Sequence, residues 1–237
     1  MGPKVRCAAQ AAPGKPVVLG VAEGYRLWSR SYDSDSNPVL ALERRIIRAR
    51  LDAMSPSSFL DVATGTGYWL GYALDRGLRA FGLDLSSEML HQAAHKPGLS
   101  RRLVQADMNT LPLQDSVADV AVCSFALGYL PGVETALREL ARVAHHVIVS
   151  DLHEHAIAAG WNRCFQHRGR QYRIQQFEHT AHDLDQAAAR AGLRIDWRES
   201  SFIGEPERMF FVRAGREYAF ENACSIPALL STCWSRA

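Results

Sequence analysis

The stretch Ser58–Gly67 (SFLDVATGTG) decides the fold class, because an apolar run that ends in an acid leads directly into a glycine-rich turn. A helix-like pattern follows at 68–76. A strand, a glycine turn and a helix in this order are typical of the first unit of a parallel sheet that binds a ligand at the carboxyl ends of its strands. Gly65 and Gly67 would let the backbone approach that ligand closely.

Two further apolar runs end in an acid at the same spacing along the chain. The run 79–84 ends at Asp84, and the run 102–107 ends at Asp107. Asp61 would repel a pyrophosphate and attract a cation such as an ammonium or a sulfonium, whereas Asp84 stands where a carboxylate accepts both hydroxyls of a ribose. Asp107 could accept a hydrogen bond from an adenine amine. Each acid alone could be a strand-end cap, but together they predict one nucleotide-like ligand across three neighbouring strand ends.

The rest of the chain alternates apolar runs with helical patterns, which predicts the α/β class. We expect a Rossmann-like, mainly parallel seven-stranded sheet with helices on both faces, an N-terminal helical lid and inserted caps. Strands are predicted at 58–63, 79–84, 102–106, 117–124, 145–150, 193–199 and 226–234, and helices at 38–54, 68–76, 86–95, 132–143 and 181–191.

One domain fits the length of 237 residues. We expect a flexible leader at 1–16 and a single domain at 17–237, composed of lid helices at 17–54, a cofactor-binding core at 55–151 and substrate caps at 152–180 and 204–225.

Composition narrows the class of protein further. The net charge of +2 gives no general attraction to nucleic acid or to a membrane surface. The five cysteines form no Cys-x-x-Cys pair, which argues against a zinc site and a disulfide framework and suits a reducing cytosol. The sequence shows neither a signal-peptide core nor a membrane-spanning run. We therefore expect a soluble, cytoplasmic protein whose oligomeric state stays open.

The motifs from about 58 to 150 resemble those of the class I S-adenosylmethionine-dependent methyltransferases, closest to the group of quinone C-methyltransferases and malonyl-carrier-protein O-methyltransferases. The matching phrases are LDVATGTG at 60–67, GLDLSSEML at 82–90, QADM at 105–108, LPL at 111–113, ADVAV at 118–122 and ALRELARV at 136–143. Two departures are Ala63, where the family usually has glycine, and a missing Pro-Gly-Gly after the last of these phrases.

This resemblance implies S-adenosylmethionine as the cofactor and assigns matching positions to its parts. For the methionine part these are Asp61 and the backbone of Ala63, Gly65 and Gly67. For the ribose and the adenine they are Asp84, Leu85, Met89, Asp107 and Met108, and for the methyl-donor region Ser124 and Phe125. Tyr25, Trp28 and Tyr32 resemble the aromatic lid of this group, although their spacing also fits a plain amphipathic helix.

Candidate residues for the acceptor lie in the two caps. His153 is the first candidate for a general base, needed only where the acceptor must lose a proton; the alternative is a structural histidine. The substrate candidates are Arg163, Arg168, Arg170 and Tyr172 in the first cap and Met209 and Phe210 in the second. Arginines suit an acidic small molecule or an acidic carrier, but the same residues fit a solvated loop and ordinary core contacts. No metal is expected.

The sequence therefore predicts methyl transfer from S-adenosylmethionine to a small molecule, with an oxygen of an acidic or hydroxylated metabolite, free or carrier-bound, as the acceptor. Methylation of nitrogen or carbon is the nearest alternative, followed by RNA or protein methylation and by a non-catalytic cofactor-binding protein. A nicotinamide oxidoreductase is disfavoured by Asp61 and by Leu70 at the place of the third glycine. Nucleic acid and membrane are not expected as partners.

Overall fold

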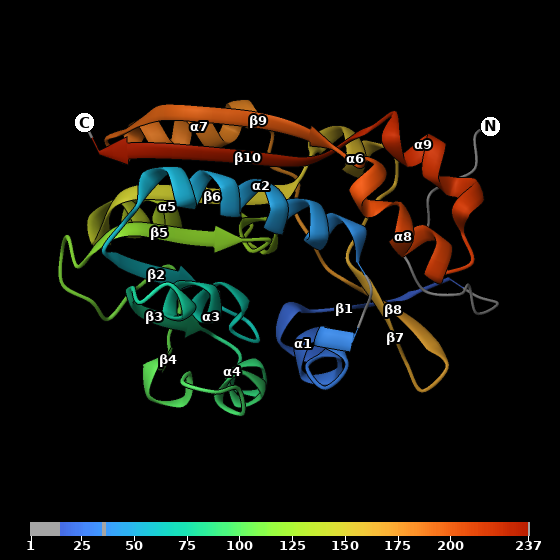
Figure 1. The fold of residues 1–237 in the computed structure, drawn as a ribbon, viewed down its shortest axis with the longest axis horizontal. Helices are drawn as coiled ribbons and strands as arrows, with labels where there is room; N and C mark the ends of the chain where they lie inside the picture. The colour runs from blue at the N-terminus through green and yellow to red at the C-terminus, as the bar shows by residue number, and fades with distance from the viewer. Residues whose placement is uncertain (1–14, 35–36, 237) are drawn as a thin grey trace.

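The computed structural model describes residues 15–34 and 37–236. Its centre is a seven-stranded sheet (Figure 1). In spatial order the strands are β4 (Leu103–Gln105), β3 (Arg79–Asp84), β2 (Ser58–Val62), β5 (Ala118–Ser124), β6 (Ala144–Leu152), β10 (Pro227–Arg236) and β9 (Leu193–Phe202). Only β10 runs opposite to the other six strands, and it is antiparallel to both β6 and β9. The predicted α/β fold with a mainly parallel seven-stranded sheet is confirmed.

The strand order reverses between β2 and β5. From β2 the chain moves outward through β3 to β4, then crosses back to β5 and continues to β6. In open sheets of this kind the ligand crevice lies outside the carboxyl ends of the two strands at the reversal. Asp61 pairs with Gly82 and Val122, and Ser124 pairs with Ser150, so the residues at these strand ends lie side by side.

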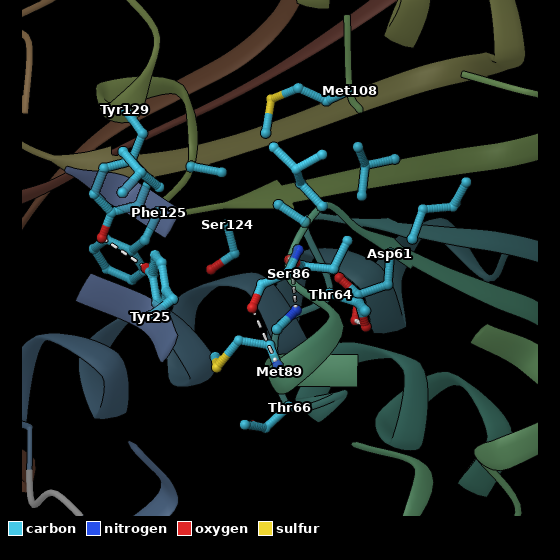
Figure 2. Close-up of a pocket in the computed structure, with 18 of the residues that line it drawn as sticks. Tyr25, Asp61, Thr64, Thr66, Ser86, Met89, Met108, Ser124, Phe125 and Tyr129 are labelled. Atoms are coloured by element: carbon cyan, nitrogen blue, oxygen red, sulfur yellow. Dashed lines mark hydrogen bonds between the residues drawn. The ribbon is translucent and has the colours of Figure 1, made fainter. Parts of the chain in front are cut away.

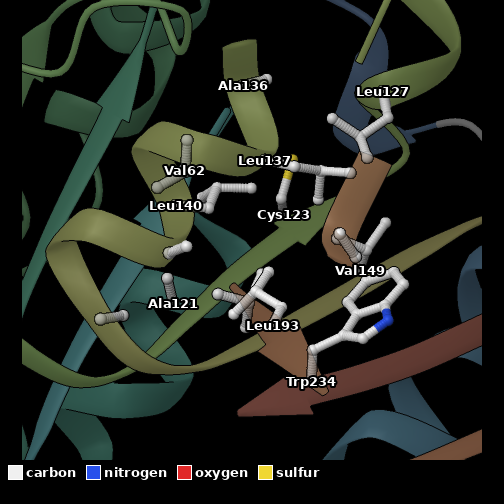
Figure 3. Packing of buried hydrophobic residues seen from close by; sticks show 14 of the residues in the cluster. Val62, Ala121, Cys123, Leu127, Ala136, Leu137, Leu140, Val149, Leu193 and Trp234 are labelled. Atoms are coloured by element: carbon white, nitrogen blue, oxygen red, sulfur yellow. The ribbon is translucent and has the colours of Figure 1, made fainter. Parts of the chain in front are cut away.

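Alternation along the strands creates two cores, one on each face of the sheet. Leu60 and Val62 point to the face covered by α5 (Glu134–Val143) and α7 (Ala181–Arg190). Figure 3 shows Val62 beside Leu140 of α5. Phe59 points to the face covered by α2 (Pro38–Met54) and α3 (Tyr68–Asp75). Burial on both faces explains why these strands read as continuous apolar runs in the sequence.

Local sequence signals agree with the observed helix boundaries. Asn37 caps α2 by accepting a hydrogen bond from the Val39 amide (2.9 Å), and Pro38 occupies the first turn. Thr180 and Asp183 form a reciprocal capping box at α7. Ser86 caps α4 (Ser87–Ala94), which flanks β3 and β4.

A second, three-stranded sheet lies beside the N-terminal segment and was not predicted. It consists of β1 (Val17–Leu19), β8 (Arg170–Ile174) and β7 (Cys164–His167), with β1 parallel to β8. The helix α1 (Val21–Trp28) packs on it, and Trp28 stacks on Phe165 with 4.9 Å between ring centroids. The first cap thus joins the N-terminal lid in one small unit (Figure 1).

The second cap lies beyond the carboxyl end of β9, on the side of the sheet to which the parallel strands point (Figure 1). Its helices are α8 (Glu205–Arg213) and α9 (Phe220–Cys224), and α8 packs against α2 through the ion pair of Arg45 with Glu207 (3.0 Å). Phe211 and Phe220 fill a separate apolar cluster with α6 (Glu154–Ala158), the short helix of the first cap.

The remaining expectations concern the leader, the cysteines and membrane-spanning helices, and they differ in outcome. The leader at 1–16 lies outside the described residues except for its last two positions. Cys123, Cys224 and Cys233 are free thiols, as expected, whereas Cys164 is disulfide-bonded and departs from that expectation. Among the described residues every helix is too short or too polar to cross a bilayer.

Candidate active site

A cavity of about 650 Å³ opens at the carboxyl ends of β2, β3, β4 and β5 (Figure 2). Its volume lies in the range of small-molecule sites. One wall comes from α1, the following segment and α2, and the opposite wall comes from the glycine turn and the ends of β3 and β4. The cavity therefore occupies the reversal point of the strand order.

Asp61 fixes the shape of the glycine turn from below. Its Oδ2 accepts hydrogen bonds from the Thr64 hydroxyl (2.6 Å) and the Leu70 amide (2.8 Å). The side chain is almost fully buried and its pKa is raised to about 7, first by burial and further by the nearby Asp84 and Glu43 carboxyls. A cationic ligand group would offset this cost, which agrees with the predicted attraction for an ammonium or sulfonium.

The turn itself uses left-handed backbone conformations. Ala63, Gly65 and Gly67 have φ angles of 60°, 55° and 82°. This conformation explains why glycine is the usual residue at position 63, because a Cβ in this region is strained by about 1–2 kcal/mol. A Cβ added at Gly67 would lie 2.4 Å from the Leu99 side chain, so helix α3 begins where only glycine fits without rearrangement.

Asp84 closes the other side of the turn. Its Oδ2 accepts a hydrogen bond from the Gly65 amide (2.7 Å) and its Oδ1 accepts one from the Ser86 amide (2.8 Å). Burial raises the pKa of this carboxyl. Each carboxylate oxygen can accept a second hydrogen bond, so Asp84 keeps the capacity to bind two vicinal hydroxyls of a ligand.

An apolar slot continues beyond Asp84. Leu85, Met89 and Met108 line it, which suits the faces of a planar ring. Asp107 also lines the cavity, but its Oδ1 already accepts hydrogen bonds from the backbone and side chain of Asn109 (2.8 and 3.0 Å). Its second oxygen is the one left to meet a ligand amine.

The aromatic lid is held to the core at two points. The Tyr25 and Tyr129 hydroxyls are hydrogen-bonded at 2.7 Å in the cavity wall. On the far side, Asp33 accepts a hydrogen bond from the Thr66 hydroxyl (2.6 Å) in the glycine turn. Tyr25 and Tyr32 line the cavity, whereas Trp28 faces away from it and packs on Phe165.

Of the fourteen predicted cofactor positions, therefore, the structure brings twelve to the cavity and leaves Trp28 and Gly67 outside its lining. Those twelve are Tyr25, Tyr32, Asp61, Ala63, Gly65, Asp84, Leu85, Met89, Asp107, Met108, Ser124 and Phe125. Along the cavity, Asp61 can attract a cation, Asp84 can bind hydroxyl groups and the apolar slot can hold a planar ring. This order fits a nucleoside with a cationic amino-acid tail.

The predicted general base does not lie at the cavity. His153 is buried at the start of α6, where its Nδ1 accepts a hydrogen bond from the His155 amide (3.2 Å). Its Nε2 is 3.1 Å from the Ser200 hydroxyl on β9, and burial lowers its pKa. These contacts are those of a helix cap, so the geometry does not support His153 as the base.

The predicted substrate residues also do not line the cavity. Arg163 is buried in an ion pair with Asp151 and lies 4.6 Å from the Tyr129 ring centroid, so it holds the first cap to β6. Arg168 and Arg170 flank the exposed turn between β7 and β8. Tyr172 packs in the cluster of the small sheet, and Met209 and Phe210 belong to α8. Neither cap contributes a residue to the lining of this cavity, and the substrate role expected for the caps stays a prediction.

Sequence reasoning missed Glu43 and Arg44 of α2, which both line the cavity. Glu43 is only 1% exposed, and its Oε1 accepts hydrogen bonds from Trp69 Nε1 (3.1 Å), Ser124 Oγ (2.8 Å) and Ser150 Oγ (2.8 Å). The signal that could have revealed it is its place between Val39 and Ile47 on the apolar stripe of the helix, where a glutamate is unexpected.

One group of potential metal ligands occurs among the described residues, formed by His146, Asp196 and Cys233. It lies near the start of β6, at the opposite end of that strand from the cavity. Asp196 already bonds to His146 (3.1 Å) and to the Ser235 hydroxyl (2.6 Å).

Comparison with known proteins agrees with this site. Residues 60–149 match the model of a family described as a methyltransferase domain. A solved structure of an S-adenosylmethionine-dependent methyltransferase from Mesorhizobium loti shares the fold, with a TM-score of 0.61 at 23% identity over 79% of this chain and 96% of that one. Residues 60–149 therefore contain a methyltransferase domain, and the chain shares its fold with an S-adenosylmethionine-dependent methyltransferase, which confirms the resemblance seen in the sequence motifs.

Two curated relatives give a closer but shorter match. Malonyl-(acyl-carrier protein) O-methyltransferase of Pseudescherichia vulneris is 33% identical over 126 residues, 52% of this chain and 48% of the relative. Demethylmenaquinone methyltransferase of Thermobifida fusca is 36% identical over 104 residues, 42% and 44% of the two chains. The chain thus spans about half the length, or less, of these relatives.

Proposed function

We propose that this chain transfers a methyl group from S-adenosylmethionine to an oxygen atom of a small acidic or hydroxylated acceptor. The observation that carries the proposal is the cavity at the strand reversal, where Asp61, Asp84 and the glycine turn converge within a matched methyltransferase domain. The bound S-adenosylmethionine supplies a methyl group already activated on a sulfonium.

The protein then has to hold the donor, align the acceptor and exclude water. Asp84 would hold the ribose hydroxyls, and Asp61 with the glycine turn would hold the amino-acid part. The wall formed by Tyr25, Phe125 and Tyr129 stands opposite these groups across Ser124 (Figure 2). This aromatic wall would keep water from the reacting atoms and position the acceptor next to the donor.

An acidic group on the acceptor would find its partner in Arg44 rather than in the first cap. Arg44 lines the cavity, stacks 3.7 Å from the Tyr68 ring centroid and forms no ion pair among the described residues. A guanidinium in this state can bind a carboxylate with two hydrogen bonds. The relative named for malonyl-carrier protein supports an acidic and carrier-bound acceptor, whereas the relative named for demethylmenaquinone leaves carbon acceptors as the alternative.

The test is an acceptor screen that measures release of S-adenosylhomocysteine. The panel contains hydroxylated aromatic acids, carboxylic acids, a malonyl thioester, amines, quinols and an RNA pool. We expect turnover with an oxygen acceptor that carries an acidic group. Turnover only with amines, quinols or RNA would overturn the choice of acceptor, and cofactor binding without any turnover would favour a non-catalytic protein.

Arg44→Gln provides the sharper comparison. It should raise KM for an acidic acceptor about tenfold or more, the loss expected for a charge-assisted contact, while KM for a neutral analogue stays the same. Arg48→Gln is the matched control, because Arg48 lies one turn further on the same helix and outside the cavity lining. If Arg44→Gln instead weakens binding of S-adenosylhomocysteine, Arg44 holds the donor's carboxylate.

A further inference from the structure

Glu43 carries a buried carboxyl group that lines the cavity. In the proposed mode of donor binding, Glu43 has no role. It reaches from α2 to the ends of β5 and β6, where it bonds to Ser124 and Ser150, and to Trp69 on α3. Among the described residues, none forms a salt bridge with Glu43. A buried acid without a cationic partner lowers the stability of the fold. A purely structural role therefore does not explain why an acid occupies this position.

The hydrogen bonds of Glu43 are distributed unevenly between its two oxygens. All three donors bond to Oε1, and Oε2 accepts no hydrogen bond from the described residues. A glutamine carbonyl could accept the same three hydrogen bonds without the cost of a buried acid. What glutamine could not supply is the second, ionisable oxygen, and Glu43 lines the cavity.

The hydrogen bond to Ser124 shows where the Glu43 carboxyl group lies in the cavity. Figure 2 shows Ser124 between the aromatic wall of Tyr25, Phe125 and Tyr129 and the turn that carries Thr64. The Ser124 hydroxyl is 2.8 Å from Glu43 Oε1. The carboxyl group therefore lies where the donor side and the aromatic side of the cavity meet.

We propose that Glu43 is the proton acceptor of the reaction and that the site methylates an acceptor with an ionisable hydroxyl group. The proposal rests on the methyl transfer proposed above. The hydroxyl oxygen bonds to the methyl carbon, the carbon–sulfur bond of the donor breaks with its electron pair on sulfur, and the hydroxyl proton passes to the Glu43 carboxylate. The products are the methyl ether, neutral S-adenosylhomocysteine and protonated Glu43.

The surroundings of Glu43 suit this role near neutral pH. Burial raises its pKa to about 7, against the lowering effect of the hydrogen bonds from Ser124, Ser150 and Trp69. The charged and titratable groups that act on it from its neighbours are Arg44 on its own helix, Asp61 on β2, Tyr68 on α3 and Tyr32 beside α1. A base with a pKa near the working pH transfers protons most efficiently.

The first test compares the wild type with Glu43→Gln, using the hydroxyl acceptor found in the screen. The variant should lower kcat about a hundredfold or more at pH 8 and lose the rise of kcat with pH through about 7. Its calorimetric affinity for S-adenosylmethionine should remain within about twofold. A large loss of that affinity would overturn the proposal, because Glu43 would then be a contact for the donor's positive charge; full turnover would overturn it as well.

The second test moves the pKa of Glu43 without removing its carboxyl group. Ser150→Ala deletes a hydrogen bond that lowers this pKa, so the acidic limb of the rate profile should shift to higher pH. Ser231→Ala is the matched control, because Ser231 is buried in register with Ser150 on β10 and does not contact Glu43. Equal profiles for Ser150→Ala and the control would assign the acidic limb to another group.

The third test requires no acceptor. Infrared difference spectra of the protein bound to S-adenosylhomocysteine should show a protonated carboxyl band that is lost between pH 6 and pH 8 and is missing in Glu43→Gln. A Glu43 that stays ionised or stays neutral across this range could not accept a proton, which would overturn the proposal. If the wild type transfers no methyl group at all but this band titrates, the proposed function has failed while the property assigned to Glu43 stands.

Discussion

The carboxyl group of Asp84, at the end of β3, accepts a hydrogen bond from the backbone amide of Gly65 in the turn after β2, at 2.7 Å. This contact ties together two strand ends that are adjacent in the sheet. It places the acid directly beside the glycine turn, so a ligand that reaches the turn also reaches Asp84. The proposed mode of cofactor binding depends on this relationship.

We expect Asp84→Asn to weaken binding of S-adenosylmethionine by more than about 1 kcal/mol, because the ribose hydroxyls lose a charge-assisted partner. Calorimetric titration measures the change. Glu88→Gln is a suitable control, because Glu88 lines the same cavity but bonds to Ser86 and Ser87 instead. Equal affinity of wild type and Asp84→Asn would mean that the ribose is held elsewhere.

Asp61→Asn should stabilise the free protein at pH 8. The folded-state pKa of Asp61, about 7, lies above the ordinary value of 3.8, so the folded state binds the proton more tightly than the unfolded state. The free energy of unfolding therefore falls as pH rises from about 4 to about 7. Asparagine does not titrate, so the variant avoids this loss and its free energy of unfolding at pH 8 should be higher than that of the wild type by about 1–3 kcal/mol.

The measurement is denaturant unfolding of wild type and Asp61→Asn at pH 5 and pH 8. The gain should be small at pH 5 and larger at pH 8, while binding of S-adenosylmethionine weakens. A variant that is destabilised equally at both pH values would show that the buried carboxylate is stabilised in its charged form.

Gly67→Ala should destabilise the fold by more than Gly77→Ala. Both glycines have a positive φ, 82° and 74°, so both variants carry the strain of a left-handed alanine, about 1 kcal/mol. Only at Gly67 would the new Cβ also meet a side chain, at 2.4 Å from Leu99, whereas nothing lies within 4 Å at Gly77. Overpacking of this kind adds about 1–3 kcal/mol. Equal melting temperatures for the two variants would contradict the packing of α3 against Leu99.

Arg163→Met should lower the free energy of unfolding by about 3–5 kcal/mol, because it leaves the partly buried Asp151 carboxylate without its charged partner. The comparison is Arg208→Met, whose partners Glu205 and Glu217 are exposed and whose loss should cost less than about 1 kcal/mol. Chemical denaturation separates the two cases. A small effect at Arg163 would mean that the first cap is held by its apolar contacts alone.

The sequence predicted the main sheet because each apolar run is short, buried on both faces and followed by a turn signal. Residues 58–63, for example, were expected as a strand and form β2 over Ser58–Val62. The small sheet was missed because β1 and β8 pair across a long stretch of chain. Neither of these short segments has a pattern that reveals such a partner.

The proposed cofactor side of the cavity was predictable for the same reason, since its residues follow strand ends in order along the chain. The proposed acceptor side was not, because it depends on where α2 crosses the sheet. Glu43 and Arg44 look like part of a charged helix surface in the sequence, and only packing buries the first and directs the second to the cavity. His153 and Arg163 were plausible by position but are used for scaffold contacts, whereas Arg168 and Arg170 flank an exposed turn.

The central claim is that this cavity binds S-adenosylmethionine, and calorimetric titration with S-adenosylmethionine, S-adenosylhomocysteine and NADH tests it most directly. We predict saturable binding of the two sulfur nucleosides at one site, weakened by Asp84→Asn, and no binding of NADH. Binding of NADH alone, or of none of the three, would contradict the assignment of the cavity and every proposal built on methyl transfer.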